Sequence, residues 1–332
     1  MPPIRTLTAL CLTAALAAPA ARADSPIPAP AASAPAELAG VPFGTMDFDW
    51  RDESRSRSVP VRLYLPDAAA AGKPVPLVVF SHGIGGSRMG YSYLGRYWAS
   101  QGYASLHLQH VGSDRNLWAG NPFGLVGRLR DAAQDKEAIA RVLDLHFALD
   151  QLLAGPLGSR IDADRIVAAG HSYGANTTLL AAGAQVERAG QKLDFRDARI
   201  KAAIILSAPP FYGETDPAKV LAGITVPTLH VTATEDIIRI PGYYSGATDR
   251  VAVFDATGSP RKALAVFAGG SHSMFTDRSG TGGMALNPKV KEATRALSLA
   301  FLKDVFDGED AALRQWPAQF AGIVARYTRL GL

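Results

Sequence analysis

The sequence has almost no cysteine. Cys11 is the only one in 332 residues, and it lies in an N-terminal segment that we expect to be removed. Without that segment the chain has no thiol, which excludes disulfide bonds, a cysteine nucleophile and a cysteine-ligated metal. The stability of the mature chain must then come from its core. Because 48% of the residues are apolar, a large core can be buried.

The apolar stretch near the N-terminus, Leu7–Ala18, is too short to span a bilayer permanently. It follows Arg5 and precedes Ala21-Arg22-Ala23, which has the small-residue pattern of a cleavage site. These features are typical of a signal peptide over residues 1–23. We therefore expect a mature protein that begins at Asp24 and is exported across a bacterial inner membrane, to the periplasm or beyond.

Charge of one sign is not concentrated in any part of the sequence. The formal net charge of +4 falls to +2 when Arg5 and Arg22 leave with the signal peptide. Lys and Arg form no denser group than the scattered Arg51, Arg55 and Arg57, which we expect on a solvated strand or turn. This pattern gives no support to nucleic acid as a partner.

After the signal peptide, the sequence predicts a linker and one domain. Residues 24–40 are rich in Pro, Ala and Ser, a composition with nothing to bury. Over residues 41–332 short apolar runs alternate with helical segments, which is typical of a mostly parallel sheet with helices on both faces. We expect leading antiparallel strands at Thr45–Trp50 and Val59–Leu65, further strands at Pro76–Phe80, Ala104–Gln109, Arg165–Ala169, Ala202–Leu206, Thr228–Thr232 and Ala263–Phe267, and helices at Tyr93–Gln101, Asp131–Leu153 and Lys289–Phe306.

The motif Gly170-His171-Ser172-Tyr173-Gly174 lies between a predicted strand and a predicted helix. In this setting Gly-x-Ser-x-Gly is the nucleophile elbow, a strained turn that leaves the serine hydroxyl accessible at a helix N-terminus. Glycine on both sides allows the strand and the helix to approach closely. The sequence therefore predicts Ser172 as a nucleophile.

A serine nucleophile needs a base, and only His230 and His272 follow Ser172 in the sequence. On an elbow fold the chain order is serine, acid, histidine. His230 lies inside an apolar run, so we expect it in the packing. His272 follows the strand at Ala263–Phe267, at the edge of the sheet where open α/β folds bind ligands. We therefore predict His272 as the base.

The acid is expected at the end of a strand between Ser172 and His272. Asp236 closes such a strand, with Glu235 beside it as the rival. The shorter side chain of an aspartate holds a histidine tautomer more rigidly, which favours Asp236. The alternative strand end carries Ser207-Ala208-Pro209 and offers no carboxylate.

Two backbone N–H groups are expected to form an oxyanion hole. One belongs to Tyr173, directly after the nucleophile, and the other to Ile84, in the glycine-rich loop after the central strand. No Gly-Lys-Ser/Thr follows this loop, so a phosphate-binding P-loop is excluded. His107 and His110 would point to opposite faces of a strand, which argues against a metal site. We expect neither a metal nor an organic cofactor.

These segments resemble α/β-hydrolases of the exported esterase type. The loop Phe80–Ser87, the segment Ser100–Tyr103 and the elbow look like those of dienelactone hydrolases and platelet-activating-factor acetylhydrolases. The segments Val226–Asp236 and Gly269–Ser273 are similar to those of cutinase-like polyester hydrolases. The resemblance implies an α/β-hydrolase fold from about residue 45 to residue 306, with a Ser-His-Asp triad.

We therefore expect a serine-dependent carboxylic ester hydrolase that acts through an acyl-enzyme on small or medium acyl esters. A polyester hydrolase and a phospholipid-acyl hydrolase are the nearest alternatives, so the partner is an ester of a small molecule, a lipid or a polymer. A serine peptidase and a non-catalytic binding protein of the same fold are further alternatives. The first usually carries a propeller or a cap, and the second would be expected to lack a triad member.

Overall fold

The computed structural model describes residues 40–71, 73–240 and 242–332. The expected signal peptide and all but the last residue of the expected linker lie outside the described residues. No helix in these described ranges is long and apolar enough to cross a membrane.

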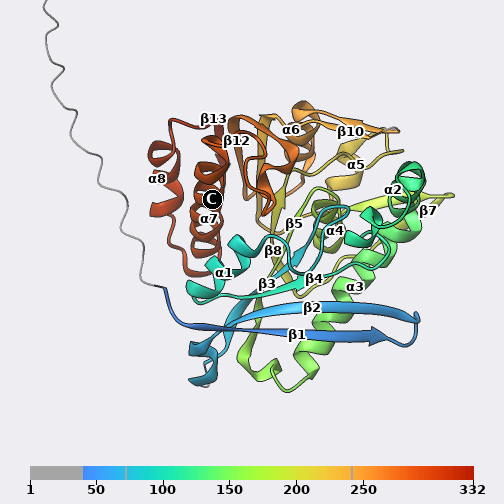
Figure 1. Ribbon diagram of the computed structural model, residues 1–332. Coiled ribbons are helices and arrows are strands. Elements are labelled where there is room, and N and C mark those ends of the chain that lie inside the picture. Colours follow the sequence, from blue (N-terminus) through green and yellow to red (C-terminus); the bar gives the residue numbers. More distant parts are fainter. Residues whose placement is uncertain (1–39, 72, 241) are drawn as a thin grey trace, which may run out of the picture. The chain divides into compact units, whose positions relative to one another are not determined.

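A nine-stranded sheet forms the centre of the described chain, in the order β1-β2-β4-β3-β5-β8-β9-β12-β13 (Figure 1). The six strands from β4 to β12 in this order are parallel. The antiparallel strands β1 and β2 form one edge, and β13 forms the other. The bounds are β1 (Phe43–Asp52), β2 (Arg57–Pro66), β3 (Val75–Ser81), β4 (Ala104–Leu108), β5 (Ile161–His171), β8 (Ile200–Leu206), β9 (Thr228–Glu235), β12 (Lys262–Ser271) and β13 (Val324–Leu330).

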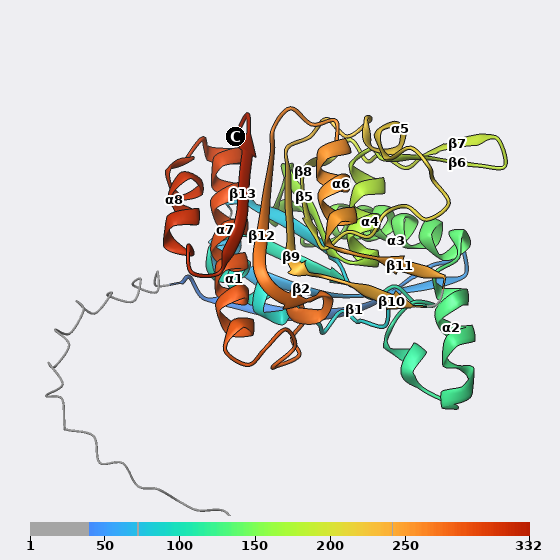
Figure 2. The same ribbon diagram turned by 90° about the horizontal axis from the view of Figure 1, so that it is seen from above.

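Helices cover both faces of this sheet (Figure 2). One face packs against α1 (Ser92–Ser100), α7 (Leu286–Asp307) and α8 (Ala311–Gln319), and the other against α3 (Asp135–Ala154), α4 (Tyr173–Ala182), α5 (Pro217–Leu221) and α6 (Ala247–Ala256). Successive strand residues alternate between the faces, so Leu77 and Val79 of β3 pack with α3 whereas Val78 and Phe80 pack with α1. The expected mostly parallel, doubly covered sheet is confirmed.

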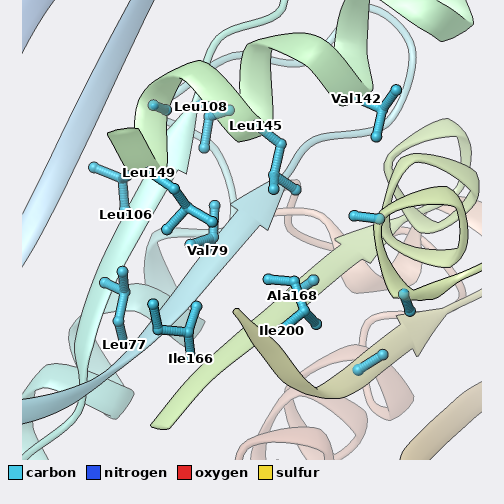
Figure 3. Packing of buried hydrophobic residues seen from close by; sticks show 14 of the residues in the cluster. Leu77, Val79, Leu106, Leu108, Val142, Leu145, Leu149, Ile166, Ala168 and Ile200 are labelled. Carbon is cyan, nitrogen blue, oxygen red and sulfur yellow. The ribbon is translucent and has the colours of Figure 1, made fainter. Parts of the chain in front are cut away.

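The face toward α3 shows why this helix forms where it does. Its apolar residues Val142, Leu145 and Leu149 recur at helical spacing and lie over the sheet, near Leu77 and Val79 (Figure 3). All of these side chains are fully buried. This packing anchors the helix that carries the buried Arg141.

The prediction of one helix over Asp131–Leu153 is wrong. The structure has α2 (Leu125–Ala132) and α3, with a break at Ala133 and Gln134. No Gly or Pro marks the break. The backbone of Gln134 is extended there, with φ −73° and ψ 156°, and Asp135 just after it pairs with Arg188 at 2.7 Å. The break also places residues of both helices along one wall of a cavity.

Two hairpins and one edge strand are absent from the sequence prediction. They are β6 (Gln185–Arg188) with β7 (Gln191–Asp194), β10 (Ile238–Ile240) with β11 (Tyr243–Ser245), and β13. Positive φ angles at Ala189 and Gly190 form the first hairpin turn, and Gly190 is the signal that could have revealed it. The remaining short helical turns are η1 (Asp67–Ala71), η2 (Arg115–Trp118), η3 (Pro122–Gly124), η4 (Gly158–Arg160) and η5 (His272–Phe275).

Candidate active site

Five neighbouring parallel strands deliver the candidate residues to one edge of the sheet. Parallel strands share a direction, so their carboxyl ends meet at the same place. In spatial order, β3 leads into the glycine-rich loop at 82–86, β5 into Ser172, β8 into Ser207, β9 into Asp236 and β12 into His272. Residues up to 190 positions apart in the chain are thereby brought together.

Ser172 lies in a strained turn between β5 and α4. Its φ of 55° and ψ of −123° are unusual for a residue with a side chain. A Cβ atom on Gly170 would overlap the carbonyl of Gly174, and one on Gly174 would overlap the carbonyl of Ser81. Only glycine fits at these two positions because the strand and the helix approach so closely. The turn thus presents the Ser172 hydroxyl at the N-terminus of α4.

The structure brings Ser172, His272 and Asp236 into one hydrogen-bonded row. The Ser172 hydroxyl lies 2.7 Å from Nε2 of His272, and Nδ1 of His272 lies 2.7 Å from Oδ1 of Asp236. With Nδ1–H donating to the carboxylate, Nε2 is free to accept the serine proton. This is the geometry that base-activated serine chemistry requires.

Asp236 is fully buried, whereas its neighbour Glu235 is exposed. Besides the bond from His272, the Asp236 carboxylate accepts hydrogen bonds from Thr232 at 2.8 Å and from Ser207. Nη2 of Arg250 lies 3.6 Å from Oδ1 of Asp236. Burial by itself raises the pKa of Asp236, but the hydrogen bond and charge of His272, with smaller contributions from Arg250 and Ser207, lower the pKa below its ordinary value. The carboxylate is therefore ionised at neutral pH.

Ser207 is a site residue that the sequence reasoning missed. Its hydroxyl donates to Oδ2 of Asp236 and lies 3.0 Å from Nδ1 of His272. It is buried, and its φ of 58° is again unusual for a residue with a side chain. The sequence shows a small polar residue directly after a buried strand. A strand end without a carboxylate can still supply the hydroxyl that holds one.

The two residues predicted for the oxyanion hole, Ile84 and Tyr173, line one cavity together with Ser172. The neighbouring amides already donate hydrogen bonds: that of Gly83 to the Tyr91 hydroxyl at 3.2 Å, and that of Gly85 to the Ser113 carbonyl at 2.8 Å. Among the described residues, the Ile84 and Tyr173 amides have no hydrogen-bond acceptor. Both N–H groups are thus available to an oxygen bound next to Ser172.

A buried arginine holds the glycine-rich loop against α4. Arg141 of α3 is fully buried and donates to the carbonyl of His82, to Ser113 at 2.7 Å and to Thr177 at 3.0 Å. Its guanidinium also lies over the ring of Tyr173, 4.5 Å from the centroid. Burial lowers the pKa of Arg141 to about 10, so the side chain stays charged at neutral pH. No sequence motif marks this residue.

A chain of hydrogen bonds also links the loop to the histidine. The Gly83 amide donates to the Tyr91 hydroxyl, which lies 2.8 Å from Nδ1 of His171. Nε2 of His171 in turn lies 2.9 Å from the carbonyl of His272. Burial lowers the pKa of His171 to about 3, so the ring is neutral and has one donor and one acceptor nitrogen. This arrangement ties the position of His272 to that of the Ile84 loop.

Two cavities meet at Ser172 and Ile84. The first has a volume of about 570 Å³ and is bordered by α2, α3, α4 and the hairpins β6–β7 and β10–β11. The second has a volume of about 450 Å³ and is lined by His272, the glycine-rich loop, Arg115, Arg239 and Arg278. Among aromatic residues, Tyr212 lines the first cavity and Trp118 lines the second.

Three other histidines, His107, His110 and His230, are buried in the packing. His230 is buried against Phe254, as expected from its apolar run. His107 stacks on Phe80 on the α1 face, whereas His110 contacts Asp144 of α3, so the two rings lie on opposite faces. In the part of the chain that the structure describes, no group of three or more His, Cys, Asp or Glu residues is placed to hold a metal.

Comparisons with known proteins agree with this architecture. A family model described as platelet-activating factor acetylhydrolase, isoform II, matches residues 54–116, which include β3, the glycine-rich loop and β4 but not Ser172. No curated protein matches the sequence. Among solved structures, a ferulic acid esterase from Streptomyces cinnamoneus is similar, with 23% identity, coverage of 85% of this chain and 94% of that chain, and a TM-score of 0.62. The chain therefore has the α/β-hydrolase fold, as the sequence predicts.

Proposed function

We propose that this chain is a carboxylic ester hydrolase with Ser172 as its nucleophile. Ser172 attacks the ester carbonyl while His272 takes its proton, and Asp236 orients the imidazole and stabilises the imidazolium. The Ile84 and Tyr173 amides stabilise the oxyanion. His272 then protonates the leaving alcohol. In the second half of the reaction His272 takes a proton from water, the water attacks the acyl carbonyl, and His272 returns the proton to Ser172 as the bond to the acid breaks.

The observation that carries the proposal is the row of two 2.7 Å contacts from Ser172 through His272 to Asp236, beside two unengaged amides. The fold alone does not decide an activity, because one fold hosts many functions. The family match and the ferulic acid esterase neighbour support ester cleavage over other hydrolytic reactions.

The two cavities suggest which side of the ester each one takes. His272 must protonate the departing alcohol, and it lines only the second cavity. We therefore assign the alcohol to the cavity of about 450 Å³ and the acyl group to the cavity of about 570 Å³, which we call the acyl cavity. Leu180, Val186 and Phe195 give this acyl cavity an apolar wall.

Hydrolysis of p-nitrophenyl acetate and butyrate by the wild-type chain and Ser172→Ala tests the proposal. We expect the variant to lose nearly all activity, with only the small residual rate that an oxyanion hole and binding provide. A fluorophosphonate should label Ser172 in the wild type and no serine in the variant. A variant that keeps a near wild-type rate would contradict the assignment. Cleavage of aminopeptidase substrates in preference to esters would favour a peptidase.

A further inference from the structure

Two buried side chains, those of Tyr91 and His171, join the glycine-rich loop to the base histidine but have no part in the proposed chemical steps. The Gly83 amide donates to the Tyr91 hydroxyl at 3.2 Å, and that hydroxyl lies 2.8 Å from Nδ1 of His171. Nε2 of His171 lies 2.9 Å from the carbonyl of His272. Tyr91 and His171 border the second cavity, but their exposed fractions are only 4% and 3%. The middle of this chain is therefore screened from a substrate.

Only one arrangement of protons satisfies all three hydrogen bonds. A carbonyl oxygen can only accept, so Nε2 of His171 carries the ring proton and donates it to His272. Because burial lowers the pKa of His171 to about 3, the ring is neutral at neutral pH, and its Nδ1 accepts from the Tyr91 hydroxyl. The Tyr91 oxygen accepts from the Gly83 amide. All the donors point from the loop toward His272, an alignment in which hydrogen bonds strengthen one another.

The position of the Tyr91 hydroxyl is fixed by the surrounding fold. Tyr91 has a φ of 57° and a ψ of 29°, a left-handed conformation that is unfavourable for a residue with a side chain. Its ring packs on Phe80 with 4.7 Å between the centroids. A Cβ atom on Gly83 would lie only 3.2 Å from the Tyr91 hydroxyl and from Nδ1 of His171. Such strain persists only where the surroundings over-determine a conformation, and it clusters at active sites.

We propose that Tyr91 and His171 are positioning residues that hold the glycine-rich loop and His272 in a fixed relation to each other. At one end of the chain, Gly83 directly precedes Ile84, whose amide is proposed to stabilise the oxyanion. At the other end, the chain holds the backbone of His272. Proton transfer and oxyanion stabilisation occur in the same transition state, so both groups must be in place together. The inference rests on the proposed ester hydrolysis.

Tyr91→Phe removes the hydroxyl at the centre of the chain. We expect kcat for p-nitrophenyl butyrate to fall about 10- to 100-fold, since misplacing a group by about 1 Å can cost about 100-fold. KM should change little, because the buried hydroxyl is screened from the substrate. Tyr93→Phe is the matched control. The Tyr93 hydroxyl donates instead to the carbonyl of Phe275 at 3.1 Å, in the segment that follows His272. This variant should keep a near wild-type kcat.

Two variants of His171 separate the bond to His272 from the packing of the ring. His171→Gln keeps an N–H donor for the His272 carbonyl, whereas His171→Leu fills the space and cannot donate. We expect His171→Leu to lose as much kcat as Tyr91→Phe, and His171→Gln to lose less. The double variant Tyr91→Phe/His171→Leu should be little worse than either single variant, because both residues act through one chain. Thermal unfolding shows whether each variant is folded.

Five results would overturn the inference. These are a near wild-type kcat in Tyr91→Phe, an equal loss in Tyr93→Phe, a loss confined to KM, a His171→Gln no more active than His171→Leu, and losses that multiply in the double variant. If Tyr91→Phe does not fold, the two His171 variants keep the test decisive. Failure of the proposed function would look different, because the wild type would not hydrolyse the ester and fluorophosphonate would not label Ser172.

Discussion

Replacing Ser207 by Ala removes a hydroxyl that touches neither cavity but donates to the buried carboxylate of Asp236. A hydrogen bond to a charged group contributes about 1.5–3 kcal/mol. If Ser207→Ala loses this stabilisation in the transition state, where the imidazolium of His272 forms, kcat falls about 10- to 150-fold. This is less than the roughly 10⁴-fold loss expected for Asp236→Asn, because Thr232 still donates to the same oxygen and His272 still bonds the other. KM should change little.

Ser207→Gly separates the role of the hydroxyl from the stability of the backbone. Ser207 has a φ of 58°, a conformation that costs a residue with a side chain about 1 kcal/mol and costs glycine almost nothing. Both variants lack the hydroxyl, but only Ser207→Gly relieves this strain. We therefore expect the glycine variant to unfold at a higher temperature than the alanine variant, with kcat lowered to a similar extent in both.

The assay is kcat and KM for p-nitrophenyl butyrate, with thermal unfolding measured on the same samples. A kcat in Ser207→Ala above half of the wild-type value would refute a positioning role for the hydroxyl. So would a glycine variant whose activity recovers along with its stability, because the effect would then lie in the backbone.

Three further predictions follow from the site and the chain. Asp236→Asn should cost orders of magnitude in kcat and Glu235→Gln little, since Glu235 is exposed; the reverse order would contradict the assignment. Burial lowers the pKa of His230 to about 3, so its neutral form stabilises the fold above about pH 6.5 and this contribution is lost as the pH falls toward 3. As the pH falls from about 6 to about 4, the unfolding free energy of His230→Gln should therefore decrease less steeply than that of the wild type, by up to about 1.4 kcal/mol per pH unit. Parallel curves for the two proteins would exclude this linkage. Exported protein should begin at Asp24 and show the same thermal unfolding with and without dithiothreitol, whereas retention of Cys11 would show that the signal peptide was misread.

Local sequence patterns were enough to predict the mostly parallel sheet and the residues that the structure brings together. The elbow can be recognised because its requirements are local, namely a strand, two glycines around Ser172 and a helix within about 20 residues. Chain order and strand ends then singled out His272 and Asp236. Asp236 follows β9 and His272 follows β12, the two strands that come after β5 and β8 in the sheet, and parallel strands place such residues at one edge.

Only the tertiary structure decided what surrounds those residues. The contact of Ser207 with Asp236 spans 29 positions, and that of Arg141 with the His82 carbonyl spans 59. No periodicity or motif encodes contacts of this kind, because they depend on how separate elements pack. The break between α2 and α3 is another example, since no Gly or Pro marks it in the sequence. The sequence determined which groups reach the sheet edge, and long-range packing decided how they are held and what shape of substrate they face.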